Sequence, residues 1–173
     1  MGRIKLLVMD VDGTLTDGRI YMGQNGELMK AFDVKDGYGI ANILPELGII
    51  PVIITGRRSG IVEQRARELR ITELYQGVSD KLAQLRRVGE KYDAGPGEIA
   101  YMGDDLNDLA CIRSCGLSAC PGDAAEEVRQ AVDYVSSCGG GRGAVRDFID
   151  RMLKGTGTEE ESLWKGSGRA SHS

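Results

Sequence analysis

The sequence predicts an α/β domain, a doubly wound and mostly parallel sheet of the Rossmann-like type with helices on both faces. Short apolar runs without helical periodicity alternate along the chain with longer segments whose apolar residues are spaced as on one helix face. Glycine supplies 25 of the 173 residues, which suits many tight turns between strands and helices. Alternating strands and helices pair the strands in parallel, so the carboxyl ends of all strands should share one edge.

The first strand is the apolar run Leu6–Met9, which has no helical stripe and therefore reads as buried on both faces. It leads directly into Asp10-Val-Asp12-Gly13-Thr14. Two carboxylates at a buried sheet edge are costly unless cations or hydrogen-bond donors offset their charge. The rest of the chain is therefore expected to supply such partners.

A small β-hairpin is expected at about residues 18–33, because Asn25-Gly26 separates two short β-prone runs. The hairpin would either stand over the acidic strand end as a flap or be an ordinary surface hairpin. The segment between Asp10 and Thr55 has room only for this hairpin and one helix. The segment between Lys81 and Asp104 has room for one helix and one strand, so we expect no cap domain.

The remaining elements follow in alternation. Helices are expected at 36–47, 60–69, 81–92, from 107, at 121–131 and at 144–153, and strands at 49–54, 71–75, 98–102, 117–120 and 134–135. After residue 154 the composition turns to Gly, Ser, Thr and Glu. This predicts one domain over 1–154 and a mobile tail over 155–173.

Composition excludes several classes of protein. A chain of 173 residues that is 41% hydrophobic can bury one core, and its net charge of −4 lacks the clustered basic face of a nucleic-acid binder. We expect no membrane segment and no signal peptide, and hence a cytoplasmic protein. Its cysteines are then expected to be reduced, buried thiols rather than a zinc site, since the only histidine lies in the tail. These cysteines are Cys111, Cys115, Cys120 and Cys138.

Polar side chains follow three of the expected strands, and a lysine opens a helix between two of them. These residues are Asp10 and Asp12, Thr55, Lys81, and the run Gly103-Asp104-Asp105. Each feature alone is common at a turn or helix start. Together they mark one edge of a parallel sheet, where ligands bind in open α/β folds.

These side chains fit phosphoryl transfer through an aspartyl-phosphate, in which a carboxylate attacks phosphorus. A carboxylate and a phosphate dianion repel each other, so a divalent cation is needed, and Mg²⁺ prefers carboxylates such as Asp10 and Asp104. Lys81 adds a fixed positive charge beside the transferred group. Asp12 is suited to general acid–base catalysis, which contributes about 10²–10⁴-fold. The Thr55 hydroxyl can bind phosphate oxygens, as can backbone N–H groups near Gly13 and Gly56.

The four motifs resemble those of the haloacid dehalogenase superfamily of phosphatases over roughly residues 4–150. The motifs are Asp10-x-Asp12-Gly-Thr, Ile54-Thr55-Gly56-Arg57, Lys81, and Gly103-Asp104-Asp105-x-x-Asp108. The resemblance implies that Asp10 is the nucleophile and Asp12 the acid and base, with Thr55 and Lys81 on the phosphate. It also implies Mg²⁺ held by Asp10, the Asp12 carbonyl and Asp104, with Asp105 or Asp108 in support.

Further segments resemble the family of 3-deoxy-D-manno-octulosonate 8-phosphate phosphatases. They are Asp17-Gly-x-Ile-Tyr-Met-Gly23, Lys30-Ala-Phe32, Asp36-Gly-Tyr-Gly-Ile40, Leu74-Tyr-Gln-Gly77 and Gly140-Gly-Arg-Gly-Ala-Val-Arg146. The resemblance implies a sugar-acid phosphate substrate for lipopolysaccharide synthesis. It also implies a homotetramer in which hairpins and C-terminal tails of neighbouring subunits close each other's sites. Asp147 departs from the family's usual Glu, and the segment after Lys154 does not resemble the family.

A sugar acid carries a carboxylate, so an arginine is expected to face the site. Arg57 directly follows the Thr55 motif, and Arg65 lies two turns into the same helix; the resemblance favours Arg65 for the carboxylate. Arg142, in the glycine cluster, is a third candidate for its own or a neighbour's site. Arg57 and Arg65 are equally well explained as solvated helix arginines, and Arg142 as part of a flexible turn before a helix.

Two alternatives stay open at this point. The first is a phosphatase for a nine-carbon sugar acid 9-phosphate. The second belongs to another class, the phospho-acceptor receiver domains, which use similar residues on a doubly wound sheet. A receiver places its acceptor aspartate after the third strand, whereas here that strand leads into Gln76-Gly77. The order of motifs therefore favours the phosphatase.

Overall fold

A computed structural model of the protein describes residues 3–155 and contains the expected sheet. Six parallel strands lie in the order β5-β4-β1-β6-β7-β8. Their bounds are β1 Leu6–Met9, β4 Ile50–Ile54, β5 Glu73–Tyr75, β6 Ile99–Met102, β7 Leu117–Cys120 and β8 Tyr134–Val135. The predicted doubly wound architecture is confirmed, and the carboxyl ends of these strands share one edge.

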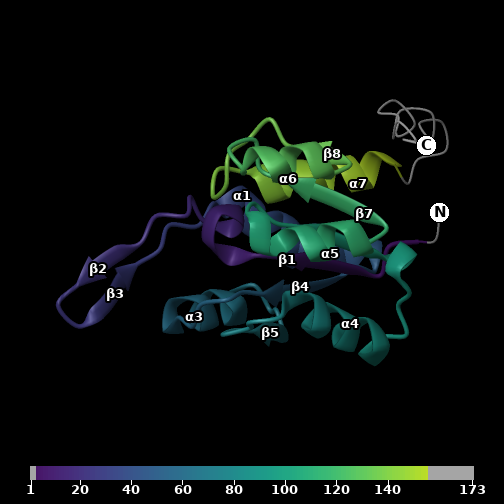
Figure 1. Ribbon diagram of the computed structural model, residues 1–173. Coiled ribbons are helices and arrows are strands. Elements are labelled where there is room, and N and C mark those ends of the chain that lie inside the picture. The colour runs from purple at the N-terminus through teal and green to yellow at the C-terminus, as the bar shows by residue number, and fades with distance from the viewer. Residues whose placement is uncertain (1–2, 156–173) are drawn as a thin grey trace.

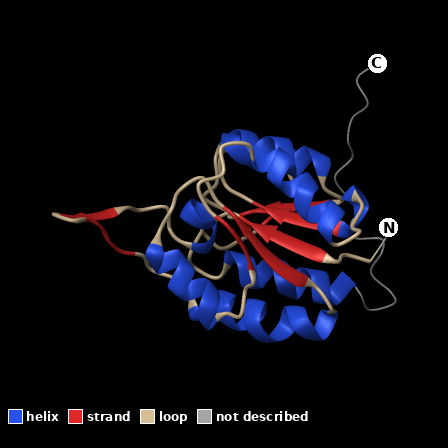
Figure 2. Cartoon of the chain, turned by 90° about the horizontal axis from the view of Figure 1, so that it is seen from below, coloured by secondary structure: helices blue, strands red, loops and turns tan. Residues whose placement is uncertain are grey.

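Helices cover both faces of the sheet, as Figure 2 shows. They are α1 Val34–Tyr38, α2 Leu44–Leu47, α3 Gly60–Glu68, α4 Lys81–Lys91, α5 Leu109–Ser114, α6 Glu126–Ala131 and α7 Ala144–Gly155. Helices α1 to α3 and α7 pack on one face, and α4 to α6 pack on the other. Strand β1 is central, so Leu7 and Met9 enter the first core while Leu6 and Val8 enter the second. This two-sided burial explains its unbroken apolar sequence.

The first helix begins earlier than the sequence pattern indicates. It starts at Val34, because the Asp33 carboxylate accepts hydrogen bonds from the backbone N–H groups of Lys35 (2.6 Å) and Asp36 (3.3 Å). Asp36, the expected first residue, is buried instead and accepts a hydrogen bond from the Arg146 N–H (2.8 Å) at the start of α7. The helix then passes through a wider π-type turn, Gly39–Ile43, before α2.

Three further boundaries differ from the prediction. Strand β5 begins at Glu73, because the Ile71 N–H bonds to the Ala66 carbonyl and so belongs to the turn after α3. Helix α6 begins only at Glu126, and Asp123 accepts a hydrogen bond from the Gly140 N–H instead of starting that helix. Helix α7 continues to Gly155, and the rest of the expected mobile tail lies outside the described residues.

The expected hairpin consists of the antiparallel strands β2 (Tyr21–Gly23) and β3 (Gly26–Met29), joined by Gln24-Asn25. It projects from the body of the domain (Figures 1 and 2). Its apolar side chains are largely uncovered, with Met22 66% and Leu28 67% exposed. Within residues 3–155 nothing else is inserted between β1 and β4 except the α1–α2 helix, so this part of the chain has no cap domain.

None of the helices in the described part of the chain combines the length and the apolar character needed to span a bilayer.

The buried carboxyl group of Asp36 should make stability depend on pH. Burial raises its pKa from 3.8 to about 6, and the backbone hydrogen bond from Arg146 only partly opposes this. The folded chain therefore keeps this proton to a higher pH than the unfolded chain. Its contribution to stability is fully present below about pH 4 and is lost as the pH rises through about 6.

Asp36→Asn removes this titration while keeping an oxygen for the Arg146 N–H. When the pH is raised from 4.5 to 7.5, the free energy of unfolding of wild type should fall by about 1–3 kcal/mol relative to that of Asp36→Asn. Urea unfolding at both pH values measures this change. Glu46→Gln, an exposed carboxylate on the neighbouring α2, should change by less than about 0.5 kcal/mol. An equal pH dependence for both variants would contradict the assignment.

Candidate active site

The acidic loop leaves the sheet at the end of β1, where the Asp10 N–H bonds to the Met102 carbonyl of β6 (3.0 Å). The chain then makes a single irregular turn, Val11–Leu15, in which Gly13 has φ +97°. A Cβ atom on Gly13 would lie 2.0 Å from Oδ2 of Asp104. Glycine is therefore required here, both for its backbone conformation and to let the Asp104 carboxylate lie against the loop.

Lys81 lies at the centre of the site. It is the first residue of α4, which Asp80 caps by accepting a hydrogen bond from the Ala83 N–H (2.9 Å). Its Nζ bonds to Oδ1 of Asp10 and to Oδ1 of Asp108, each at 2.8 Å. Burial alone would lower the pKa of Lys81, but attraction to the two carboxylates raises it above its ordinary value. The lysine thus stays charged between two buried acids.

The two carboxylate oxygens of Asp108 are fully occupied by hydrogen bonds, so this residue supports the geometry of the site. Its Oδ1 accepts from Lys81 and from the Tyr101 hydroxyl (2.6 Å), and its Oδ2 accepts from the N–H groups of Asp104 (3.1 Å) and Asp105 (3.3 Å). The Asp105 carboxylate is exposed and caps its own short helical turn by accepting from the Leu106 N–H (2.8 Å). Both residues therefore shape the loop after β6.

Asp10, Asp104 and Asp108 form a group that can hold a metal ion, since one oxygen of each lies within 4.8 Å of the others. Burial, together with the charges of Asp10 and Asp108, raises the pKa of Asp104 to about 8. Burial also raises the pKa of Asp10 to about 6, against the opposing effect of Lys81. One ammonium group does not balance three carboxylates. Because Asp108 is saturated, Asp10 and Asp104 are the available ligands, and an all-oxygen set of this kind suits Mg²⁺.

Thr55 follows β4, the neighbour of β1, and is buried. Its backbone is fixed by its N–H to the Tyr75 carbonyl (2.9 Å) and by the Val78 N–H to its own carbonyl (3.1 Å). Gly56 after it is exposed. Thr55 thus stands at the same sheet edge as Asp10, as the strand order predicts.

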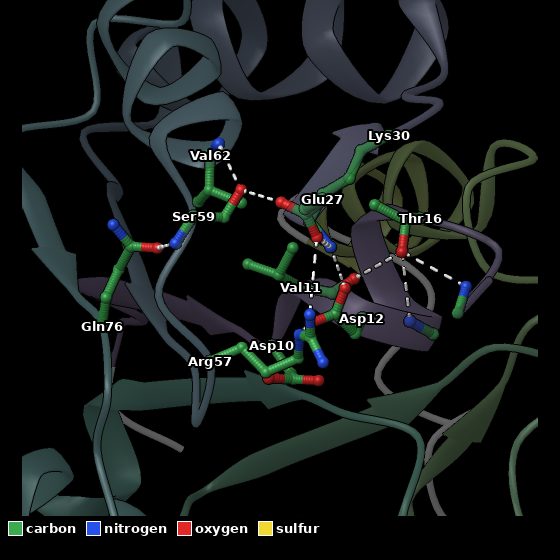
Figure 3. Close-up of polar contacts among 12 residues, drawn as sticks. Asp10, Val11, Asp12, Thr16, Glu27, Lys30, Arg57, Ser59, Val62 and Gln76 are labelled. Atoms are coloured by element: carbon green, nitrogen blue, oxygen red, sulfur yellow. Dashed lines mark hydrogen bonds and ion pairs between the residues drawn. The ribbon is translucent and has the colours of Figure 1, made fainter. Parts of the chain in front are cut away.

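Asp12 faces cations that come from two other parts of the chain (Figure 3). Lys30, just after β3 of the hairpin, donates a hydrogen bond to Oδ1 of Asp12 and lies 2.9 Å from Oε1 of Glu27. Arg57 places its Nε 3.7 Å from Oδ2 of Asp12. Sequence reasoning missed Lys30 and Glu27 as site residues. The only available signal was the Lys30-Ala-Phe32 segment of the family resemblance.

The three candidate arginines have different surroundings. Arg57 faces Asp12 with a side chain that is 45% exposed. Arg65 is not brought to Asp12: its guanidinium lies over the Phe32 ring (5.6 Å) and donates to Glu68 (3.2 Å). Arg142 has an exposed side chain, although its glycine-rich turn packs tightly on the acidic loop.

The cysteines behave as structural thiols. All four are free, and Cys111 and Cys120 are buried. Burial raises the pKa values of Cys111, Cys115 and Cys120 to about 12, so these thiols stay protonated at neutral pH. In the described part of the chain, the carboxylates around Asp10 are the group arranged for a metal.

Comparison with known proteins agrees with this geometry. Residues 67–149 match the haloacid dehalogenase-like hydrolases. The 3-deoxy-D-manno-octulosonate 8-phosphate phosphatase KdsC of Escherichia coli K12 is 47% identical over 159 residues, 92% of this chain and 84% of that protein.

Solved structures give the same result. The phosphatase of the same name from Yersinia pestis is 46% identical with a TM-score of 0.84, and the match covers 87% of this chain and 81% of that one. The phosphatase from Moraxella catarrhalis, solved with a magnesium ion, a phosphate ion and a KDO molecule, is 43% identical with a TM-score of 0.84. That match covers 87% of this chain and 86% of the other.

Fold and site together define a haloacid dehalogenase-like hydrolase without a cap domain in its described residues. Within that class, the chain belongs to the family of 3-deoxy-D-manno-octulosonate 8-phosphate phosphatases. The resemblance inferred from the sequence motifs is confirmed.

Proposed function

We propose that this protein is a Mg²⁺-dependent phosphatase that hydrolyses 3-deoxy-D-manno-octulosonate 8-phosphate to the free sugar acid and phosphate. The observation that carries the proposal is the buried Asp10–Lys81–Asp108 group with Asp104 beside it, at the sheet edge where the family motifs converge. The substrate follows from the relatives, whose names and bound molecules concern this sugar acid.

In the first step, a carboxylate oxygen of Asp10 forms a bond to phosphorus as the bond from phosphorus to the sugar oxygen breaks. Asp12, protonated, gives its proton to the leaving oxygen. In the second step, water attacks phosphorus, Asp12 takes the proton from that water, and the bond between phosphorus and Asp10 breaks. Both carboxyl groups thereby return to their starting states.

The charge on the phosphoryl group is balanced by several residues of the chain. Lys81 supplies a fixed ammonium, and Thr55 with the N–H groups around Gly13 and Gly56 binds the remaining oxygens. Bound at Asp10, the Asp12 carbonyl and Asp104, Mg²⁺ would neutralise part of the negative charge between carboxylate and phosphate. Asp105 and Asp108 keep the loop that carries Asp104 in place.

The substrate's own carboxylate needs a cation within reach of this site. Arg57 is favoured, since it lies beside Asp12 and its side chain is partly exposed. Arg65 could take this part only by leaving its contacts with Phe32 and Glu68. Arg142 is exposed and could serve its own or a neighbouring subunit's site.

The assembly that fits this site is a homotetramer whose hairpins close neighbouring sites, while the C-terminal tail lies outside the described residues. Its support lies in apolar side chains that a lone chain leaves uncovered. They gather on the hairpin and on α1: Ile20, Met22, Leu28, Met29, Val34 and Tyr38. The four free thiols favour a reducing compartment, and we place the protein in the cytoplasm.

Asp10→Asn tests the nucleophile. The amide cannot form the acyl phosphate, so phosphate release should fall at least about 10³-fold while circular dichroism stays native. Asp150→Asn, a change of the same kind on the outside of α7, should keep activity within about twofold. Asp10→Asn activity within tenfold of wild type would contradict the assignment.

A phosphate-release assay with Mg²⁺ on both sugar-acid phosphates distinguishes the eight-carbon substrate from the nine-carbon substrate. We expect kcat/KM for 3-deoxy-D-manno-octulosonate 8-phosphate to exceed that for the nine-carbon 9-phosphate at least about tenfold. Equal or inverted preference would support the nine-carbon alternative. A single phosphorylation by acetyl phosphate without turnover would instead point to a receiver domain.

A further inference from the structure

The Lys30 side chain is buried although it directly follows a hairpin strand whose apolar side chains are exposed. Its side chain is 1% exposed, while Leu28 and Met29 beside it are 67% and 51% exposed. Burying an ammonium is costly unless carboxylates compensate it. Here Asp12 and Glu27 do so from two sides, as Figure 3 shows.

The contacts of Lys30 continue beyond Asp12. The second oxygen of Glu27 accepts a hydrogen bond from the Ser59 hydroxyl, and Ser59 is the residue that caps α3. The Ser59 N–H in turn donates to Oε1 of Gln76 (2.8 Å), which follows β5. The base of the hairpin is therefore joined by polar contacts to the acidic loop and to the start of α3.

We propose that Lys30 is a positioning residue for Asp12, so that proton transfer depends on the hairpin being seated against the acidic loop. This inference rests on the proposed phosphatase function. Lys30 lies too deep to receive substrate directly, and it acts by holding the Asp12 carboxylate in one orientation toward the leaving oxygen.

The charges around Asp12 explain why Arg57 alone would not hold the Asp12 carboxylate in one orientation. Asp12 and Glu27 are two carboxylates facing two cations, Lys30 and Arg57. Arg57 lies 3.7 Å from each carboxylate and has a side chain that is 45% exposed, so it holds Asp12 loosely. Without Lys30, the more distant and partly exposed Arg57 would be the remaining cation to orient Asp12. A displacement of about 1 Å in a reacting group can cost about 10²-fold in rate.

A purely structural role makes a different prediction. If Lys30 only fastened the hairpin, its loss would lower activity by the same factor whether or not Asp12 is present. If Lys30 acts through Asp12, its loss should have no effect once Asp12 is gone. A double-mutant cycle separates the two.

The cycle compares wild type, Lys30→Met, Asp12→Ala and the double variant, by phosphate release from the sugar-acid 8-phosphate with saturating Mg²⁺ at high enzyme concentration. We expect Lys30→Met to lower kcat about 10–100-fold with KM changed less than about threefold. In the Asp12→Ala background, Lys30→Met should change kcat less than about twofold. Lys35→Met, an exposed lysine at the start of α1, should keep wild-type kinetics.

Lys30→Met activity within threefold of wild type, or an equal loss in both backgrounds, would overturn the inference while leaving the proposed function intact. A wild-type enzyme that releases no phosphate would overturn both. If Lys30→Met does not fold, Glu27→Gln replaces it, since this change weakens the contact that seats Lys30. Its smaller loss of kcat should likewise vanish in the Asp12→Ala background.

Discussion

The contact on which the site depends is the pair of 2.8 Å bonds from Lys81 to Asp10 and Asp108 at the buried sheet edge. Asp108 is held by four donors, so it fixes Lys81, and Lys81 fixes Asp10. Asp104 is left half-buried beside these acids, with the Thr14 hydroxyl as a hydrogen-bond donor (3.0 Å). The excess negative charge costs stability and makes the site a receptor for a divalent cation.

Close packing of backbone makes this cluster possible. A Cβ on Gly103 would lie 2.4 Å from the Asp108 carboxyl carbon, and one on Gly13 would meet Asp104. The turn before α7 packs on the same loop, since a Cβ on Gly140 would lie 1.9 Å from the Gly13 carbonyl oxygen. Glycines from three distant segments therefore let the carboxylates and their loops approach one another.

Much of this could be predicted from the sequence, because each feature is local. The carboxylates after the apolar β1 run and Thr55 follow strands, and Lys81 begins a helix. The parallel topology brings these residues to one edge of the sheet. The choice between Asp33 and Asp36 as helix cap could not be predicted, because it depends on Asp36 meeting Arg146, 110 positions away. The places of Lys30 and Arg65 depend on how the hairpin base packs, which periodicity does not encode.

We infer that Asp104 is held among like charges until a cation binds, and thermal unfolding of wild type and Asp104→Asn tests this inference. At pH 8.5 without metal, Asp104→Asn should unfold at a higher temperature than wild type, since it removes one repelling carboxylate. Millimolar Mg²⁺ should raise the wild-type midpoint in a concentration-dependent way and leave Asp104→Asn nearly unchanged. A wild-type midpoint that does not respond to Mg²⁺, or a metal-free Asp104→Asn less stable than wild type, would show that Asp104 is not held among like charges for a cation.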